Sequence, residues 1–179
     1  MNEMDPGSKR NTDQFASGPF RPHGRVEIWA EGNVVRLDAA GPFNEEAIIA
    51  LGAAWRSLFA ELPLCGPFAD VVLLRRSILA SQKVVDAFGL FLAANTQAGH
   101  APSVVAWIVP PEIEGRSFML PKFAEIYAAA ERPFAAFETE AEAEAWVRAK
   151  LQEAVASPRE PNDGRPAGTA DIDGLKHLP

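Results

Sequence analysis

Hydrophobic and polar residues alternate along two short segments near the start of the chain. Val26–Ala30 and Val34–Asp38 carry apolar side chains at nearly every second position, and Glu31-Gly32-Asn33 connects them. A period of two is typical of a strand with one buried face, and a short connection containing Gly favours a hairpin. The pattern therefore predicts an antiparallel hairpin over residues 26–38.

A helical period replaces this alternation after Gly41-Pro42-Phe43. Asn44 is a suitable N-cap, and Glu45 and Glu46 stand in the first turn, where the helix dipole favours negative charge. The apolar residues that then recur at helical spacing are Ile48, Leu51, Trp55, Leu58 and Leu62. This spacing predicts a helix that ends before Pro63.

Two continuous apolar runs follow, Phe68–Leu74 and Ser103–Val109, and both are typical of strands covered on two faces. Helical spacing comes after each run. Ser81 is a suitable cap for the first of these helices and Gly99 marks its end, whereas the second helix begins near Ser117.

The last elements complete an alternating order of strands and helices. Phe134–Phe137 has the pattern of a short strand, and the capping box Thr139-x-x-Glu142 predicts a helix that ends near Ala156. Strands that alternate with helices form parallel sheets with right-handed crossovers. We therefore predict an α/β fold, with a mixed, largely parallel sheet of about five strands, an N-terminal hairpin and about four helices.

Both ends of the chain differ from this pattern. Residues 1–22 are rich in Gly, Pro, Ser and charge, and residues 157–179 contain four prolines and three glycines. Such segments bury too little apolar surface to offset the about 1–2 kcal/mol per residue that ordering a backbone costs. We predict disordered tails over 1–22 and 157–179, and a single domain over 23–156.

Composition and charge narrow the classes of partner. The chain has 179 residues, a net charge of −7 and 17 scattered Lys and Arg residues, which argues against nucleic-acid binding. No apolar run approaches the roughly 18 residues of a membrane-spanning helix, and the polar N-terminus lacks a secretory signal. Cys65 is the single cysteine, which excludes an intramolecular disulfide and an all-cysteine metal site. We expect a soluble, cytoplasmic protein with no metal and no other cofactor.

The succession of motifs resembles the STAS fold and, more narrowly, the SpoIIAA-like (STAS/SEC14-related) bacterial proteins. Gly41-Pro42-Phe43-Asn44 is similar to the turn before the first helix of that family, and Phe137–Val147 is similar to its closing Phe-x-(Thr/Asp)-Glu-x-x-Ala-x-x-Trp run. The resemblance covers residues 23–152. It implies a STAS-like fold and a non-catalytic binding or regulatory module.

Two positions depart from this family. Its members usually carry an Asp at the end of the strand before the second helix, where this chain has Leu73-Leu74-Arg75-Arg76. Phosphorylated STAS regulators carry a Ser at the start of that helix, and Ser81 falls near this place within the unlike sequence Ile78–Lys83. The departures speak against a kinase-controlled sigma-factor switch.

The sheet order predicts where a ligand would bind. Ligands of open α/β sheets collect beyond the C-terminal ends of the parallel strands, here at loops 38–44, 75–81 and 109–117. The candidate residues for an anionic ligand or an acidic partner are Phe43, Arg75, Arg76, Ser77, Ser81, Glu112 and Arg116. In the alternative interpretation, Ser81 only caps its helix and both neighbouring arginines are solvated.

Two rival functions remain open. The chain could carry a small apolar or lipid-like ligand, as the likeness of the family to lipid-transfer folds implies. It could also be an enzyme that uses Glu112 or His100, although His23, His100 and His177 lack the spacing of metal ligands.

Two apolar features would mark a contact surface. Trp29 faces away from Val26 and Ile28 in the hairpin, so it lines an interface if helices cover only one side. The run from Phe88 to Leu92 is apolar on more than one helix face, which suits a small cavity or a homodimer contact. The partner is thus an unknown protein, a second copy or a small ligand.

Overall fold

Each predicted strand and helix forms close to its predicted bounds. The computed structural model describes residues 9–17, 20–61 and 66–156. The predicted tail 157–179 and Cys65 lie outside these described residues. The elements are β1 (Arg10–Asn11), the 3₁₀ helix η1 (Thr12–Phe15), β2 (Arg25–Glu31), β3 (Val34–Ala40), α1 (Glu45–Glu61), β4 (Ala69–Arg75), α2 (Gln82–Gln97), β5 (Val104–Ile108), α3 (Arg116–Ala129), β6 (Phe134–Phe137) and α4 (Glu140–Ala156).

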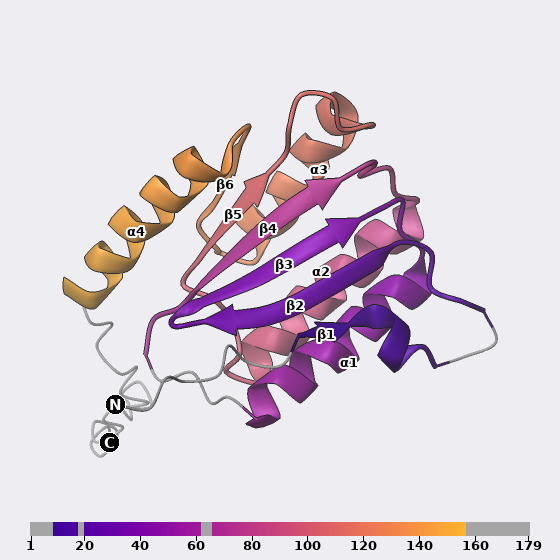
Figure 1. Cartoon of the computed structure of the whole chain (residues 1–179), viewed down its shortest axis with the longest axis horizontal. Coiled ribbons are helices and arrows are strands. Elements are labelled where there is room, and N and C mark those ends of the chain that lie inside the picture. The colour runs from indigo at the N-terminus through magenta and orange to yellow at the C-terminus, as the bar shows by residue number, and fades with distance from the viewer. Residues whose placement is uncertain (1–8, 18–19, 62–65, 157–179) are drawn as a thin grey trace, which may run out of the picture.

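The strands form one sheet in the order β1-β2-β3-β4-β5-β6 (Figure 1). The pairs β1–β2 and β2–β3 are antiparallel, whereas the pairs from β3 to β6 are parallel. The prediction of an α/β fold with a largely parallel sheet and an N-terminal hairpin is confirmed. The sheet has one strand more than predicted, because β1 extends it beyond the hairpin.

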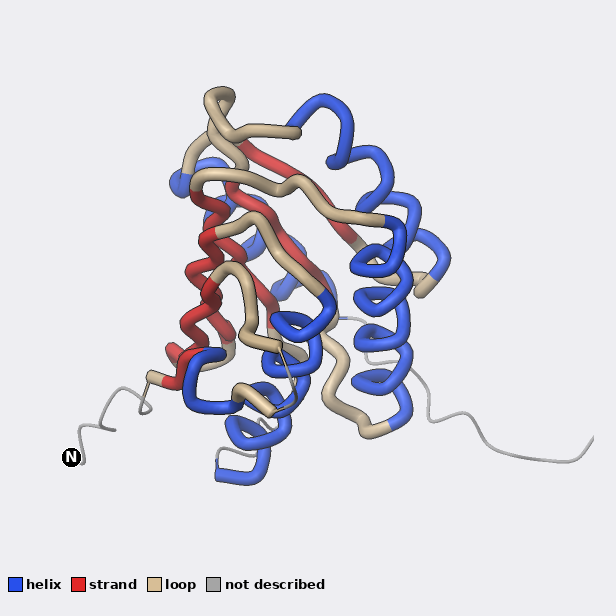
Figure 2. Tube along the Cα trace, turned by 90° about the vertical axis from the view of Figure 1, so that its right-hand side faces the viewer, coloured by secondary structure: helices blue, strands red, loops and turns tan. Residues whose placement is uncertain are grey.

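The helices cover the two faces of the sheet unequally. Because the parallel strands follow in sequential order and their crossovers have one hand, α1, α2 and α3 all lie on the same face (Figures 1 and 2). The last helix, α4, crosses to the other face and packs against β4, β5 and β6. Among the described residues, no helix covers the outer face of β2 and β3 (Figure 1).

Burial follows this layering. The larger apolar cluster lies between the sheet and α1–α3, where Ile28, Val35 and Trp55 are at most 1% exposed. The smaller cluster joins Ala143, Val147 and Leu151 of α4 to the opposite face of β4 and β5. The two continuous apolar runs are therefore buried on both faces, as predicted.

The predicted helix caps are also formed. Oδ1 of Asn44 accepts a hydrogen bond from the Ala47 N–H (3.1 Å), and Oγ of Ser81 accepts one from the Val84 N–H (3.4 Å). Thr139 and Glu142 exchange hydrogen bonds with each other's backbone N–H, so the capping box holds the start of α4.

The prediction of a disordered tail over 1–22 is wrong for the segment from Arg10 to Phe15. Arg10 is 6% exposed, donates to Oγ of Ser57 (3.1 Å) and forms an ion pair with Glu61 of α1. Oγ1 of Thr12 is fully buried and accepts from the N–H of Val26. The segment folds through polar contacts to α1 and β2, which a search for apolar periodicity does not detect.

None of the helices in the described part of the chain is long and apolar enough to cross a lipid bilayer.

Candidate functional site

The three predicted loops do meet at the C-terminal edge of the parallel strands. The N–H of Gly41 donates to the carbonyl of Arg75 (3.2 Å), and the N–H of Ile78 donates to the carbonyl of Glu114 (2.9 Å). Ser77 and Glu114 form an isolated parallel bridge. Backbone hydrogen bonds therefore hold the loops together, as the topology predicts.

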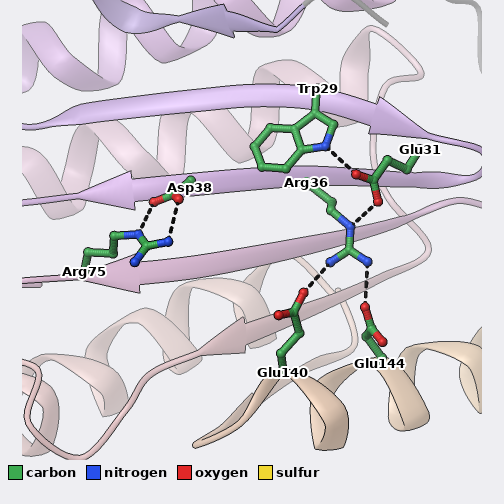
Figure 3. Close-up of polar contacts among 7 residues, drawn as sticks. All are labelled: Trp29, Glu31, Arg36, Asp38, Arg75, Glu140 and Glu144. Atoms are coloured by element: carbon green, nitrogen blue, oxygen red, sulfur yellow. Dashed lines mark hydrogen bonds and ion pairs between the residues drawn. The ribbon is translucent and has the colours of Figure 1, made fainter. Parts of the chain in front are cut away.

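The cations predicted at this edge are largely engaged within the protein. Nε and Nη2 of Arg75 donate to the two carboxylate oxygens of Asp38 (2.7 and 2.9 Å), on the outer face of the sheet (Figure 3). This hydrogen-bonded carboxylate raises the pKa of Arg75. Arg116 donates to the carbonyl of Val109 (3.1 Å) and to Glu138 (2.9 Å). Neither side chain is free for an anion without losing a partner.

The remaining candidates point in different directions. Ser77 is 2% exposed, and its Oγ accepts from the N–H of Leu79 within the turn. Phe43 points inward, toward the space between the sheet and the helices. Arg76, Ser81 and Glu112 are exposed, and Arg76 has a left-handed backbone (φ 67°). The structure thus gathers the loops but does not gather the seven side chains into one anion site.

The residues weighed for catalysis lie far apart. His100 precedes β5 and Glu112 follows it, so they stand at opposite ends of that strand. The His100 ring stacks on Phe59, with ring centroids 4.5 Å apart. In the ranges that the structure describes, no three His, Cys, Asp or Glu side chains come close enough to hold a metal ion.

The outer face of the hairpin carries a network that spans two layers (Figure 3). Trp29 and Arg36 stand opposite each other in the β2–β3 register. Nε1 of Trp29 donates to Glu31 (2.7 Å), and the same carboxylate accepts from Nε of Arg36 (2.5 Å). Arg36 also donates to Glu140 (3.0 Å) and Glu144 (2.6 Å) of α4. Its guanidinium therefore links the hairpin to the helix.

Charge stabilises this network. The hydrogen bond from Trp29 and the neighbouring Arg36 lower the pKa of Glu31. Desolvation alone would lower the pKa of Arg36, but its hydrogen bonds to Glu144 and Glu31 outweigh that effect and raise it. Both shifts favour the charged forms of Glu31 and Arg36, so this ion pair persists near neutral pH.

A cavity of about 70 Å³ lies between the inner face of the sheet and the helices α1–α3. Most of its lining is apolar, and it includes Phe43 and Ile78 from the loops at the C-terminal edge of the strands. Cavities that hold drug-sized ligands measure about 300–1,000 Å³, so this space is too small for a lipid. It does not favour the predicted lipid-like cargo.

The polar residues that line this cavity were not among the site residues predicted from the sequence. Asp70, Asn95 and Arg132 line it, and they are 8%, 6% and 6% exposed. Asp70 is the only polar residue within the apolar run 68–74, which is a signal that the sequence does contain. The lining runs along β4 from Asp70, its second residue, to Leu74 near its C-terminal end, so Asp70 lies far from the predicted edge.

Burial governs the ionisation of this cluster. Desolvation raises the pKa of Asp70 well above its ordinary value, although the positive charge of Arg132 opposes the shift. Desolvation and the nearby Asp70 also raise the pKa of Tyr127, whose hydroxyl accepts a hydrogen bond from Trp107 (3.2 Å). The uncharged form of both groups is therefore favoured inside the cavity.

Comparisons with protein-family models, with curated proteins and with solved structures find no match for this chain.

Proposed function

We propose that the chain is a non-catalytic binding or regulatory module that contacts a protein partner through the outer face of β2 and β3. The observation that carries the proposal is the pair of Trp29 and Arg36, fixed side by side on a sheet face that no described helix covers. In the alternative interpretation, the network only attaches α4 to the hairpin and binds no partner. The two interpretations differ in what the loss of the Trp29 ring does.

The residue types support a contact surface. Trp and Arg are enriched among the few interface residues that dominate binding energy, because each offers a large rigid surface together with hydrogen bonds. Trp29 is half-buried and its indole N–H is already bonded to Glu31, so its ring is held before any partner arrives. Binding then costs little side-chain entropy.

The charges of this face are mostly satisfied within the protein. Arg25 pairs with Glu27 (2.8 Å), and Arg75 pairs with Asp38 (2.7 Å). The ammonium of Lys9 lies over the Trp29 ring, 4.3 Å from its centroid. A partner therefore gains little from net charge and more from an apolar patch packed on the exposed part of this half-buried ring. We expect binding that depends weakly on salt, since screening acts mainly on unpaired exposed charges.

The resemblance to STAS domains implies the same class of function, and the α/β fold with a largely parallel sheet is compatible with it. A small anion at the strand-end edge is the weaker version of the proposal, since Asp38 and Glu138 already engage two of its arginines. The enzyme alternative has no assembled acid–base pair behind it, as Glu112 and His100 lie at opposite ends of β5.

Photo-crosslinking from position 27, on the same face of β2 as Trp29, in the cells that make this protein identifies the partner, and titration with the purified partner then tests the face. Trp29→Ala should weaken binding by about 30-fold, the loss of one dominant interface residue. Leu90→Ala is the matched control, because Leu90 is an exposed apolar residue (73%) on α2, across the sheet. Equal binding by the parent, the control and Trp29→Ala would refute the proposal, provided that all three share one thermal midpoint.

A further inference from the structure

The cavity between the sheet and α1–α3 contains two polar atoms that lack hydrogen bonds. Oδ1 of Asp70 and Nε1 of Trp55 are both buried, and no described residue bonds to either atom. Both side chains line the cavity. Trp55 is 1% exposed and Asp70 is 8% exposed, so bulk solvent does not satisfy them.

Such atoms are rare in folded proteins, because an unpaired buried donor or acceptor loses its bonds to water and gains none. Here the indole N–H is a donor, the carboxyl oxygen can accept, and both residues line the same cavity. Trp55 lies in the second half of α1 and Asp70 is the second residue of β4, so two separate elements bring these side chains to the cavity.

The surroundings select against a charged ligand. Arg132 acts electrostatically on Asp70 but donates its Nη2 to Oγ1 of Thr96 (2.9 Å). The apolar walls would desolvate a charged ligand of either sign, and a cationic ligand would also meet the positive charge of Arg132. An uncharged head with one donor and one acceptor avoids these costs.

The volume limits the size of the ligand. The cavity measures about 70 Å³, and a cavity needs at least about 10–15 Å³ to hold one water molecule. The space therefore accepts only a ligand of a few non-hydrogen atoms. A short aliphatic chain fits the lining of Val72, Phe88 and Leu92 around it.

We infer that this cavity binds a small uncharged amphiphile, a short-chain alcohol or primary amide, whose head bonds to the Asp70 carboxyl group and the Trp55 indole N–H. The site is inside the protein, away from the Trp29 face. Its occupancy is therefore independent of the proposed partner contact, and the failure of one leaves the other standing.

Titration of the full chain with 1-butanol and with 1-chlorobutane tests this inference. The two probes share shape and chain length, but only the alcohol forms strong hydrogen bonds. We expect 1-butanol to bind about tenfold more tightly, the value of one hydrogen bond, and to shift the indole N–H resonance of Trp55 in NMR spectra. Butylammonium and butyrate should bind more weakly than the alcohol.

Two variants locate the effect. Asp70→Leu and Trp55→Phe each remove one of the unpaired atoms, so the preference for 1-butanol over 1-chlorobutane should fall toward one. Leu90→Ala should retain it. Equal affinity of the parent protein for both probes, or no binding of either because the cavity holds water only, would overturn the inference even if a variant fails to fold. Tighter binding of a charged probe would overturn it as well.

Discussion

At the scale of single residues, Asp70 is an acid in an apolar setting. Its side chain interrupts a run of apolar residues on a strand buried on both faces, and the residue is only 8% exposed beside a mostly apolar cavity. Arg132 offsets part of the cost through its charge. The presence of a residue that lowers the stability of the free protein is explained if that residue contributes to binding. The ligand that we propose for the cavity would give Asp70 this role.

Asp70 also sets a pH dependence of stability. Burial raises its pKa in the folded state above the roughly 3.9 of an exposed Asp, so the folded protein holds a proton that the unfolded chain has lost. Stability from this group is therefore greatest below about pH 4 and falls as pH rises toward the folded-state pKa. The loss is about 1.4 kcal/mol for each unit of elevation.

Urea denaturation of the parent and of Asp70→Asn between about pH 5 and 9 measures this effect, because a span of about four pH units reveals the slope of stability against pH. The variant cannot titrate, so its stability relative to the parent should increase as pH rises. Parallel curves for the two proteins would show that Asp70 is ionised throughout and that its burial is compensated.

Only part of this cavity site can be predicted from the sequence. The apolar run 68–74 places Asp70 on a buried strand, and a single acid there is a visible anomaly. Its neighbours Trp55 and Arg132 come from α1 and from the segment before β6, and no local pattern brings them to one cavity. Trp55 was predicted as core and is core, but its unpaired N–H depends on the packing around it.

At the scale of elements, periodicity predicts every long helix and strand, and it misses the short polar ones. The helix of Ile48, Leu51 and Trp55 has a strong apolar stripe, whereas β1 and η1 consist of six residues from Arg10 to Phe15. Their order comes from hydrogen bonds to α1 and β2, between residues at least 14 positions apart. Such contacts leave no signature in local sequence.

Thr12→Val tests whether this N-terminal segment is part of the folded domain. The change keeps the buried shape but removes the Oγ1 that accepts from the N–H of Val26 (3.1 Å). An unpaired buried N–H should lower the free energy of unfolding by about 1–3 kcal/mol. Asp13→Asn, at an exposed neighbouring position, should change it by less than about 0.5 kcal/mol. Similar small effects from both variants in thermal or urea denaturation would show that the segment is a loosely attached tail.

At the scale of the whole molecule, the order of strands decides which surfaces remain open. Sequential parallel strands send α1, α2 and α3 to one face, and one further helix is too narrow to cover the other. The alternation in the hairpin predicts that Trp29 faces outward. Whether α4 covers it depends on where that helix docks, and α4 docks on β4–β6 instead.

Arg36 is the residue that ties this docking to the hairpin, so it should control how firmly α4 is held. Its side chain is 21% exposed and bonds to Glu31 of β2 and to Glu140 and Glu144 of α4. Isolated exposed ion pairs contribute about 0.2–1 kcal/mol, and a network is the case in which such pairs add measurably. A double-mutant cycle of Arg36→Gln and Glu144→Gln should therefore give a coupling energy of about 0.5–1 kcal/mol that shrinks as salt increases.

Hydrogen exchange separates this coupling from general stability. Removing the guanidinium should speed exchange in α4 while the amides of α1 stay protected, because α1 packs on the opposite face of the sheet. The apolar contacts of Ala143, Val147 and Leu151 remain, so α4 should loosen without unfolding. Uniform acceleration in both helices would mean that Arg36 contributes only to global stability. If hydrogen exchange is unchanged and the cycle gives no coupling energy, the network does not hold α4 in place. The proposed partner contact at Trp29 would then have to form without support from the network.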